Sequence, residues 1–542
     1  MHGRTTFGLD VRVPGMRFAV IARAPVLGAR VAGVDDRAAR AHAGVRDVVV
    51  IDADALPDLG GTSPRPPWGV AVVADSTWTA TTGRELLRVR WDARGGGTES
   101  TDALRAAAAA RVAQRPAYVV RDDGDVERAL AAAVHRLDAT YEVPLLAHAP
   151  MEPLSCTAHA TTDRCELWAP TQNPEELRDA VKRTTGLADA AIVVHPVRMG
   201  GSFGRRFYHD FAIEAVLVSR AAGAPVQVVW TRDDDIRHDL YRPSGTYRLA
   251  GGVDAEGRPV AWDVHLANAS RGHWLKWRGR HVPDSWDPEE IERFPFPVGC
   301  IPHLRIGYSP LASRIPRGQW RAVEPSANVF VVEGFLDELA HLAGRDPLAF
   351  RLSLLEPARQ LPFYDRRWDT GRLAAVLRLA AARAGWPRAS APGRGLGIAG
   401  SYANGAYVAH VAEASVTDGS IRVHRVTSAV DAGLVVNPLG ARAQVEGAVT
   451  YGLSAALYQE ITVRDGQVVQ HHFGDYPTLR IDEAPDVAVH FVDGDAAPAG
   501  LGEGALPPIA PAVANAVFAA SGVRLRRMPF RIPESTGARQ EH

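Results

Sequence analysis

The chain has 542 residues, of which 46% are hydrophobic and 23% are charged, and its formal net charge is -1. This length fits two to four domains of ordinary globular composition. The balanced charge gives no support to a polyanion partner such as nucleic acid, and no apolar stretch is long enough to span a membrane.

The three cysteines are Cys156, Cys165 and Cys300, and none of them forms a C-x-x-C pair. This chain alone therefore cannot hold a four-thiolate iron–sulfur cluster, and a redox function would need an external electron carrier. The N-terminal residues Met1–Arg4 lead directly into strand-like sequence, without a signal peptide. We expect a cytoplasmic protein, or a periplasmic one if an upstream segment is missing.

The first part of the chain, residues 6–92, is expected to form short strands and one small helix. Apolar runs bounded by Gly, Pro and Asp predict strands at 18–22, 48–51 and 69–74. A flexible joint at 95–97 follows. An alanine-rich helix is then expected at 104–112, and a turn at 122–125 that caps the next helix.

A second block begins near residue 139, and a linker at 387–393 separates it from a strand-rich third block. Strands are expected at 140–143, 191–195 and 226–230, and helices at 210–219, 328–342 and 511–520. Strands and helices mix without regular βαβ alternation. The pattern therefore predicts an α+β protein built in several layers.

Gly200-Gly-Ser-Phe-Gly204 follows a predicted strand and precedes a predicted helix. Consecutive glycines allow successive backbone N–H groups to point at one anion, and Arg205 and Arg206 add positive charge. The same residues match the G-x-S-x-G nucleophile elbow, with Ser202 as the nucleophile. A tight turn with solvated arginines is the third interpretation, and the sequence leaves all three open.

Glu503 stands between two glycines in Leu501-Gly-Glu-Gly-Ala-Leu-Pro-Pro508, just ahead of a predicted helix. Glycine neighbours leave its side chain free to project into a cavity. The apolar neighbours Leu501, Leu506 and Ile509 would raise the pKa of its carboxyl and suit it to act as a general base. The alternative is a solvated glutamate in a turn.

Three further polar side chains are candidates for a ligand site. Arg321, between a proline-containing turn and a helix, could hold an oxyanion or a carbonyl group. Gln172 ends a strand with an amide that could hydrogen-bond a polar ligand. Arg351 by itself is typical of a helix surface, and each of the three has a solvent-exposed alternative.

Two other patterns are not expected to form sites. Gly395–Gly400 fits G-x-G-x-x-G, but it lacks the preceding strand and following helix that a dinucleotide-binding fold needs. His471, His472 and Asp475 cluster near a predicted strand end. Adjacent side chains of a strand point to opposite faces, so a shared metal ion is not expected there.

Eight short segments occur in order along the chain. They are Ala147–Pro153, Trp168–Gln172, Gly200–Gly204, Trp230–Asp234, Trp320–Arg321, Asp431–Pro438, Gln444–Gly447 and Gly502–Gly504. The series resembles the molybdopterin-binding subunit of xanthine dehydrogenase and aldehyde oxidase. Its first and fifth segments look most like the isoquinoline 1-oxidoreductase branch, and the resemblance covers nearly the whole chain.

The resemblance implies a small α/β hammerhead domain followed by two large mixed molybdenum-cofactor-binding domains. The implied boundaries are 1–95 for the hammerhead domain, 96–138 for a linker with helices, and 139–386 and 395–542 for the two large domains.

The resemblance also assigns roles to single residues. Glu503 matches the active-site base, and Arg321 matches an arginine that orients substrate or stabilises developing charge on oxygen. Residues beside the molybdopterin and its metal are matched by Gln172 and by Gly201, Ser202, Phe203 and Gly204 of the glycine loop. Arg351 falls where the family has an arginine close to the cofactor.

The implied reaction is hydroxylation of an sp² carbon in a small N-heterocycle or aldehyde, with water as the oxygen source. The implied cofactor is molybdenum–molybdopterin in its cytosine dinucleotide form, with no protein side chain on the metal. Electrons would leave through a small partner subunit that carries [2Fe–2S], which agrees with the cysteine count.

One departure from the family pattern is clear. The family also contacts the pterin through a Gly-Gln-Gly stretch, which Arg317–Trp320 does not match, and which lies N-terminal to this chain in the isoquinoline branch. The chain is then a split subunit completed by a second polypeptide, a sequence with a misassigned start, or a degenerate form. Two competing functions are a serine hydrolase that uses Ser202 with Asp431 and His471, and a non-catalytic half-subunit.

Overall fold

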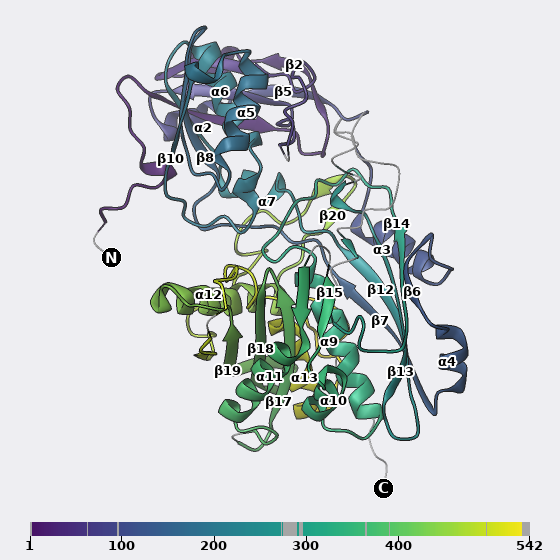
Figure 1. Ribbon diagram of the computed structural model, residues 1–542. Coiled ribbons are helices and arrows are strands. Elements are labelled where there is room, and N and C mark those ends of the chain that lie inside the picture. The colour runs from purple at the N-terminus through teal and green to yellow at the C-terminus, as the bar shows by residue number, and fades with distance from the viewer. Residues whose placement is uncertain are drawn as a thin grey trace.

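The computed structural model describes residues 3–533, apart from 62, 95–96, 273, 275–289, 292–295, 364–365, 390 and 495. Sheets of seven, five and four strands, each with helices packed on it, form this part of the protein. The seven-stranded sheet lies at one end of the molecule and the four-stranded sheet at the other (Figure 1). This mixed, layered arrangement confirms the predicted α+β class. Most of the predicted joint at 95–97, and residue 390 of the predicted linker, lie outside the described residues.

The seven-stranded sheet has the strand order β10–β9–β8–β11–β1–β4–β3. Its strands are β1 (Arg17–Arg23), β3 (Val45–Ile51), β4 (Gly69–Ala74), β8 (Ser155–Ala160), β9 (Cys165–Ala169), β10 (Ile192–Pro196) and β11 (Val226–Val229). β1 pairs in parallel with β11, so strands from both sides of residue 95 share one sheet. Ile21 and Val228 also lie in one buried cluster. The predicted boundary at residue 95 therefore does not separate two hydrophobic cores.

Helices cover this sheet because their apolar side chains are buried against it. α6 (Asp210–Ala222) packs against β8, and α5 (Pro174–Thr185) packs against β10. α1 (Arg37–Ala41) and α2 (Thr77–Glu85) pack around β1, β3 and β4, and β2 (Arg30–Asp35) pairs with β5 (Arg88–Asp92). The N-terminal part thus has two helices where the sequence predicted one.

The five-stranded sheet has the order β6–β14–β13–β12–β7. Its strands are β6 (Tyr118–Asp123), β7 (His135–Val143), β12 (Gly245–Val253), β13 (Pro259–Asn268) and β14 (His303–Pro310). The helices α3 (Thr101–Val112), α4 (Val126–Ala132) and α9 (Pro325–Leu342) pack on it. Asp125 is the N-cap of α4 and accepts a hydrogen bond from the Arg128 backbone N–H, which confirms the predicted capping turn.

The four-stranded sheet has the order β17–β18–β19–β22. Its strands are β17 (Arg394–Ala403), β18 (Ala406–Thr417), β19 (Ser420–Asp431) and β22 (Asp486–Phe491), and α11 (Thr370–Ala384), α12 (Pro438–Leu457) and α13 (Ile509–Ser521) pack on it. A Cβ atom at Gly397 would lie 2.1 Å from the backbone nitrogen of Ala516, so glycine is needed where α13 crosses β17. The G-x-G-x-x-G pattern therefore lies within β17 and serves its packing against α13.

Shorter elements connect these layers. They are α7 (Arg232–Arg237), α10 (Pro347–Leu355), β15 (Gln360–Phe363) with β16 (Arg366–Asp369), β20 (Val463–Arg464) with β21 (Gln467–Val468), and the 3-10 turns η1 (Gly8–Asp10), η2 (Asp189–Ala191) and η3 (Arg205–Phe207). The other predicted strands and helices are confirmed, with ends shifted by a few residues. Among the described residues, no helix combines the length and apolar character that crossing a membrane requires.

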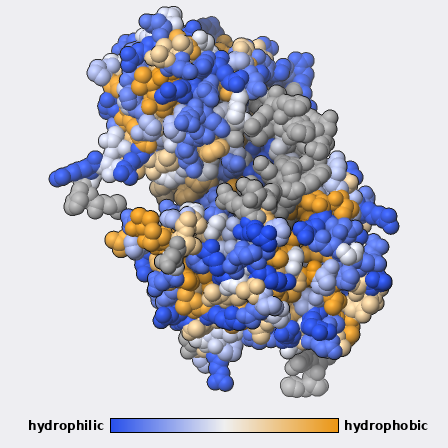
Figure 2. Space-filling model, in the orientation of Figure 1, coloured by the Kyte–Doolittle hydropathy of each residue, from blue (hydrophilic) through white to orange (hydrophobic). Residues whose placement is uncertain are grey.

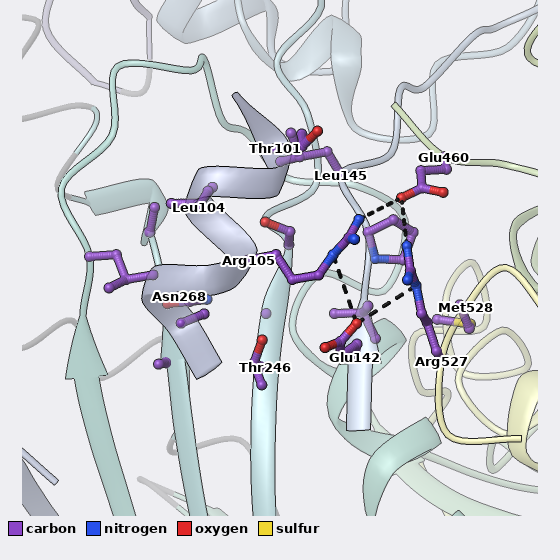
Figure 3. A pocket seen from close by; sticks show the side chains of 18 of the residues that line it. Thr101, Leu104, Arg105, Glu142, Leu145, Thr246, Asn268, Glu460, Arg527 and Met528 are labelled. Atoms are coloured by element: carbon purple, nitrogen blue, oxygen red, sulfur yellow. Dashed lines mark hydrogen bonds and ion pairs between the residues drawn. The ribbon is translucent and has the colours of Figure 1, made fainter. Parts of the chain in front are cut away.

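A small, partly open pocket between α3 and the five-stranded sheet is bordered by four charged side chains (Figure 3). Arg105 and Arg527 each face Glu142 and Glu460, with N···O distances of 3.5–3.9 Å. The space measures about 40 Å³, enough for a few water molecules only. This charged cluster joins an early helix to the C-terminal segment, and it leaves no room for a cofactor.

Candidate active site

The glycine loop, Gly200–Gly204, connects β10 to η3 and α6. Gly201, Phe203 and Gly204 have positive φ angles of 100°, 56° and 109°. A Cβ atom at Gly204 would lie 1.9 Å from the Gln319 carbonyl oxygen, so only glycine allows this approach. The glycine loop therefore packs directly against the segment that carries Arg321.

The backbone amides of the loop divide into two groups. Gly200 N–H donates to Glu152 Oε2 at 2.7 Å, and Gly204 N–H donates to Gln172 Oε1 at 3.2 Å. Within the described part of the chain, the three amides between them, 201–203, donate to no protein acceptor. Successive free N–H groups in a loop of alternating φ sign form a concave anion-binding surface.

Arg205 and Arg206 lie behind the loop and are fully buried. Arg205 makes a bidentate pair with Asp210 at 2.7 and 2.8 Å, and Arg206 donates to the Glu152 carbonyl oxygen at 2.8 Å. The interpretation in which these arginines lie in solvent or face a ligand is wrong. Arg205 Nη1 and Nη2 and Arg206 Nε and Nη2 donate to internal acceptors, and both side chains support the loop from inside.

Gln172 and Ser202 hold each other at the base of the loop. Ser202 Oγ donates to Gln172 Oε1 and accepts the Arg206 N–H at 3.0 Å. The two residues that would complete a serine hydrolase triad are elsewhere: Asp431 pairs with Arg372, and His471 pairs with Asp475. The serine hydrolase interpretation is therefore wrong, because Ser202 has no histidine partner among the described residues and its hydroxyl is used for structure.

Three aromatic rings stack between the glycine loop and the Arg321 segment. Phe203 stacks on Tyr451 of α12 with ring centroids 4.1 Å apart, and Tyr451 stacks on Trp320 at 4.7 Å. Trp320 is buried. This column fixes Phe203 relative to the residue that precedes Arg321.

Arg321 is held at two of its three guanidinium nitrogens. Nε donates to the Gly502 carbonyl oxygen at 2.7 Å, and Nη2 donates to the backbone and side-chain oxygens of Gln444, both at 3.1 Å. No hydrogen bond from Nη1 to a protein acceptor occurs within the described residues. Burial lowers the pKa of Arg321, with Tyr451 and Glu503 opposing the shift, but an arginine stays protonated at neutral pH.

Glu503 lies against the same segment. Its Oε1 accepts the Ala322 backbone N–H at 2.9 Å, and its Oε2 accepts the Asn404 side-chain amide. Glu503 is half-buried and has polar donors beside its carboxylate. The structure thus brings Glu503, Arg321 and the glycine loop together, and both oxygens of the carboxylate accept hydrogen bonds.

Strained backbone is concentrated at this site. Seven described non-glycine residues have positive φ, and five of them belong to the segments above: Ala149, Phe203, Ala322, Val323 and Asn404. Positive φ is costly for such residues, most of all for a β-branched valine. Surrounding contacts must impose these conformations, which is typical of functional sites.

Arg351 lies outside this group. It is fully buried, its Nε donates to Glu333 Oε2 at 2.7 Å, and its Nη1 donates to the Pro347 carbonyl oxygen at 3.0 Å. These contacts tie α10 to α9. The structure therefore does not bring Arg351 to the glycine loop.

The His471, His472 and Asp475 cluster lies in a turn and not on a strand. The two imidazole rings are 4.3 Å apart, and His471 Nδ1 lies 2.7 Å from Asp475 Oδ2. The argument that their side chains diverge is wrong, since potential ligand atoms of all three residues lie within 4.8 Å of one another. Within the described chain, no hydrogen bond or ion pair connects this turn to Glu503.

Four residues of the site were given no role from the sequence, although two of them lie in the segments Ala147–Pro153 and Gln444–Gly447. They are His148, Asn404, Gln444 and Tyr451. Gln444 and Tyr451 are seven residues apart on α12, so helical periodicity could have placed both on one face. Asn404 precedes Gly405 in the β17–β18 turn, where Asn-Gly is a hairpin signal and gives no sign of a catalytic neighbour.

Comparison with known proteins gives two family matches. The molybdopterin cofactor-binding domain matches residues 101–278, and a second molybdopterin cofactor-binding domain matches residues 377–485.

Three relatives align with nearly the whole chain. The membrane-bound aldehyde dehydrogenase (pyrroloquinoline-quinone) of Gluconacetobacter polyoxogenes is 30% identical, over 98% of this chain and 70% of that protein. The beta subunit of isoquinoline 1-oxidoreductase from Brevundimonas diminuta is 28% identical, over 98% and 66%. A subunit of nicotinate dehydrogenase from Pseudomonas putida is 30% identical, over 97% and 45%. The chain thus spans between 45% and 70% of these relatives' lengths.

Solved structures share the fold. Quinoline 2-oxidoreductase from Pseudomonas putida 86 superposes with a TM-score of 0.76 at 15% identity, covering 97% of this chain and 95% of that one. Aldehyde oxidoreductase from Desulfovibrio gigas gives a TM-score of 0.77 at 16% identity, covering 97% and 78%.

Proposed function

This chain belongs to the family of molybdopterin-binding large subunits of molybdenum hydroxylases, and from that premise we propose that it carries the catalytic site of such an enzyme. The proposed reaction is oxidation of a small N-heterocycle or aldehyde with water as the oxygen donor. The observation that supports it most directly is the convergence of Glu503, Arg321 and the glycine loop, which come from three distant parts of the sequence.

The residues present fit a bound molybdopterin cofactor. The free amides of residues 201–203 offer a row of donors to an oxygen-rich group, and Phe203 borders them with a fixed aromatic ring. A side-chain atom at Gly502 would meet nothing within 4 Å, so open space lies beside Glu503. When bound, the molybdenum centre would supply the oxygen-transfer and electron-accepting chemistry that protein side chains lack. We propose the cytosine dinucleotide form of the cofactor.

Glu503 is the proposed proton acceptor. Its two oxygens are oriented by the Ala322 N–H and the Asn404 amide, and each carboxylate oxygen keeps a further lone pair for a proton. The Ala322 N–H belongs to a turn with strained backbone angles, which fixes its direction. This backbone donor therefore orients the Glu503 carboxylate in addition to the rotamer preference of the side chain.

Arg321 is the proposed electrophilic group. Gly502 and Gln444 fix its guanidinium plane through Nε and Nη2, which leaves Nη1 to donate to a substrate oxygen or a developing negative charge. A fixed donor of this kind is effective because it needs no reorganisation during the reaction.

The electron acceptor is proposed to be a small [2Fe–2S] subunit. Cys156 and Cys165 are buried in the seven-stranded sheet, and burial raises the pKa of the Cys165 thiol to about 12 and that of Cys300 to about 11. These thiols therefore stay protonated at neutral pH without a metal, and three cysteines are too few for the four thiolates of a [2Fe–2S] cluster.

A protein partner is also supported by the surface. Apolar side chains gather at the start of α12 (Figure 2), where Leu434, Val436 and Leu439 are 57%, 78% and 81% exposed. Gln444, which holds Arg321, lies on the same helix. Exposed apolar patches of this kind mark interaction surfaces. We propose that this surface receives a second chain that supplies a pterin-contacting Gly-Gln-Gly segment.

The test is expression of the chain with its [2Fe–2S] subunit and any second chain encoded beside it, followed by metal analysis and release of the pterin. We expect molybdenum with molybdopterin, and oxidation of isoquinoline, nicotinate or benzaldehyde. A complex that contains all chains but no molybdenum would refute the proposal. Molybdenum bound without turnover of any such substrate would favour the non-catalytic half-subunit.

A further inference from the structure

His148 is buried between the glycine-loop region and the Arg321 segment. Its side chain has no exposed surface. On one side, Nδ1 lies 3.0 Å from both carboxylate oxygens of Asp239, and on the other, Nε2 lies 2.8 Å from the Gln319 carbonyl oxygen. The ring therefore bridges a buried carboxylate and the backbone just before Trp320 and Arg321.

Both ring nitrogens of His148 face oxygen atoms that accept hydrogen bonds. A carbonyl oxygen cannot donate, so Nε2 must carry a proton. Asp239 is ionised, because it also accepts the His148 and Leu240 backbone N–H groups and lies 2.9 Å from Arg205 Nε. Although burial acts to raise it, the pKa of Asp239 is lowered by His148 and Arg205. The ring thus donates from Nε2 to the Gln319 carbonyl oxygen, while Asp239 holds it from the opposite side.

The backbone around His148 holds the aromatic column. Tyr451 Oη donates to the His148 carbonyl oxygen at 2.8 Å, and Trp320 Nε1 donates to the Ala147 carbonyl oxygen at 3.3 Å. Tyr476 closes the group, with its hydroxyl at 2.9 Å from both the nitrogen and the oxygen of Ala147. Ala147 and His148 thus contact two of the stacked aromatic rings, Tyr451 and Trp320. His148 also contacts the turn before Arg321 and the buried carboxylate of Asp239.

We propose that His148 is a positioning residue whose ring, held by Asp239, fixes the Gln319 carbonyl and thereby the turn that aims Arg321 and holds Glu503. The chain of contacts is short. Gln319 O is bonded to His148, Arg321 follows two residues later, and the next residue, Ala322, donates to Glu503. The positive φ of Ala322 needs an external restraint, and the His148 bond supplies one.

This inference rests on the proposed function, since it treats Arg321 and Glu503 as active-site groups, but its first test does not need the cofactor. Amide hydrogen exchange followed by mass spectrometry compares wild type with His148→Gln. We expect peptides that cover 319–322 and 501–506 to exchange at least tenfold faster in the variant, because a Gln side chain cannot contact both Asp239 and the Gln319 carbonyl as the imidazole ring does. His265→Gln is the matched control, a buried histidine of β13 that bonds Ser309.

The second test uses the assembled, molybdenum-loaded enzyme. His148→Gln should lower kcat at least tenfold per molybdenum, with KM changed by less than threefold, whereas His265→Gln should leave both unchanged. A merely structural histidine would lower the yield or the melting temperature but not kcat per loaded site. If His148→Gln does not fold, Asp239→Asn serves as the second variant, since it weakens the same bridge while keeping the shape of the side chain.

Unchanged exchange at 319–322, or unchanged kcat per molybdenum, would overturn the proposal. A ¹⁵N spectrum of histidine-labelled wild type that shows no proton on Nε2 of His148 would overturn it as well. Failure of the proposed function gives a different pattern, in which no substrate is oxidised but the exchange difference and the proton on Nε2 remain.

Discussion

Replacing Glu503 by Gln is the most direct perturbation of the site. The two side chains have the same shape, and the Gln oxygen can still accept the Ala322 N–H at the 2.9 Å position. The new amide NH₂ faces the Asn404 amide, which must turn to present its oxygen. Loss of one such hydrogen bond costs about 1 kcal/mol in a half-buried place, so the fold should be kept and the melting temperature should fall by no more than a few degrees.

The catalytic effect should be much larger. A positioned general base contributes about 10²–10⁴ in rate, equivalent to roughly 3–5 kcal/mol of barrier. We therefore expect Glu503→Gln to lower kcat at least 100-fold, with molybdenum content unchanged. The assay is steady-state oxidation of a substrate that the wild type turns over, with the rate divided by bound molybdenum.

The matched control is Glu256→Gln, which makes the same charge change in the exposed β12–β13 turn, where Glu256 pairs with Arg258. It should keep the wild-type rate. If Glu503→Gln turned over within twofold of wild type at equal molybdenum loading, Glu503 would not be the base, and the assignment of the site would fail with it.

Three further outcomes are expected. Arg321→Lys should lower kcat/KM by about 10- to 1000-fold in steady-state assays without loss of molybdenum. The reason is that an ammonium group cannot bond both Gly502 and Gln444 and still present a fixed donor. A kcat/KM equal to that of wild type would exclude the proposed role of Arg321. Arg351→Ala should lower the free energy of unfolding in urea by about 3–5 kcal/mol, because it leaves the Glu333 carboxylate buried without its partner. The rate per molybdenum should be unchanged. Loss of cofactor without loss of stability would contradict this prediction. Burial lowers the pKa of His410 from 6.5 to about 4, so the ring is neutral in the folded protein at pH 7. The neutral ring contributes its full stabilisation above pH 6.5, and this stabilisation is lost as the pH falls toward 4. At pH 5 this loss is about 2 kcal/mol, and a His410→Gln variant should show a correspondingly smaller drop in unfolding free energy between pH 7 and 5.

The sequence by itself was sufficient for the local structure around the site. Strand, glycine loop and helix follow one another at 192–222 as their patterns predict, because apolar periodicity and glycine conformations are local properties. The isolated carboxylate of Glu503 could also be found, since a glutamate between two glycines ahead of a helix is visible in a short window.

Other features of the site depended on contacts between distant segments. Ala322 and Glu503 are 181 positions apart, and His148 and Gln319 are 171 apart, so no local pattern could pair them. The surroundings of Arg205 and Arg206 were also predicted wrongly, because a charged pair beside glycines has the same pattern whether it faces a ligand or the interior.

The sheets show the same division. Strand positions were predictable, but the pairing of β1 with β11 was not, and that pairing places the N-terminal segment in the core of the next one. Hydrogen bonding between strands and burial of charge are decided by which segments meet in space. The sequence therefore determined which groups were available for chemistry, and the tertiary structure decided which of them meet and which are used up in holding the fold.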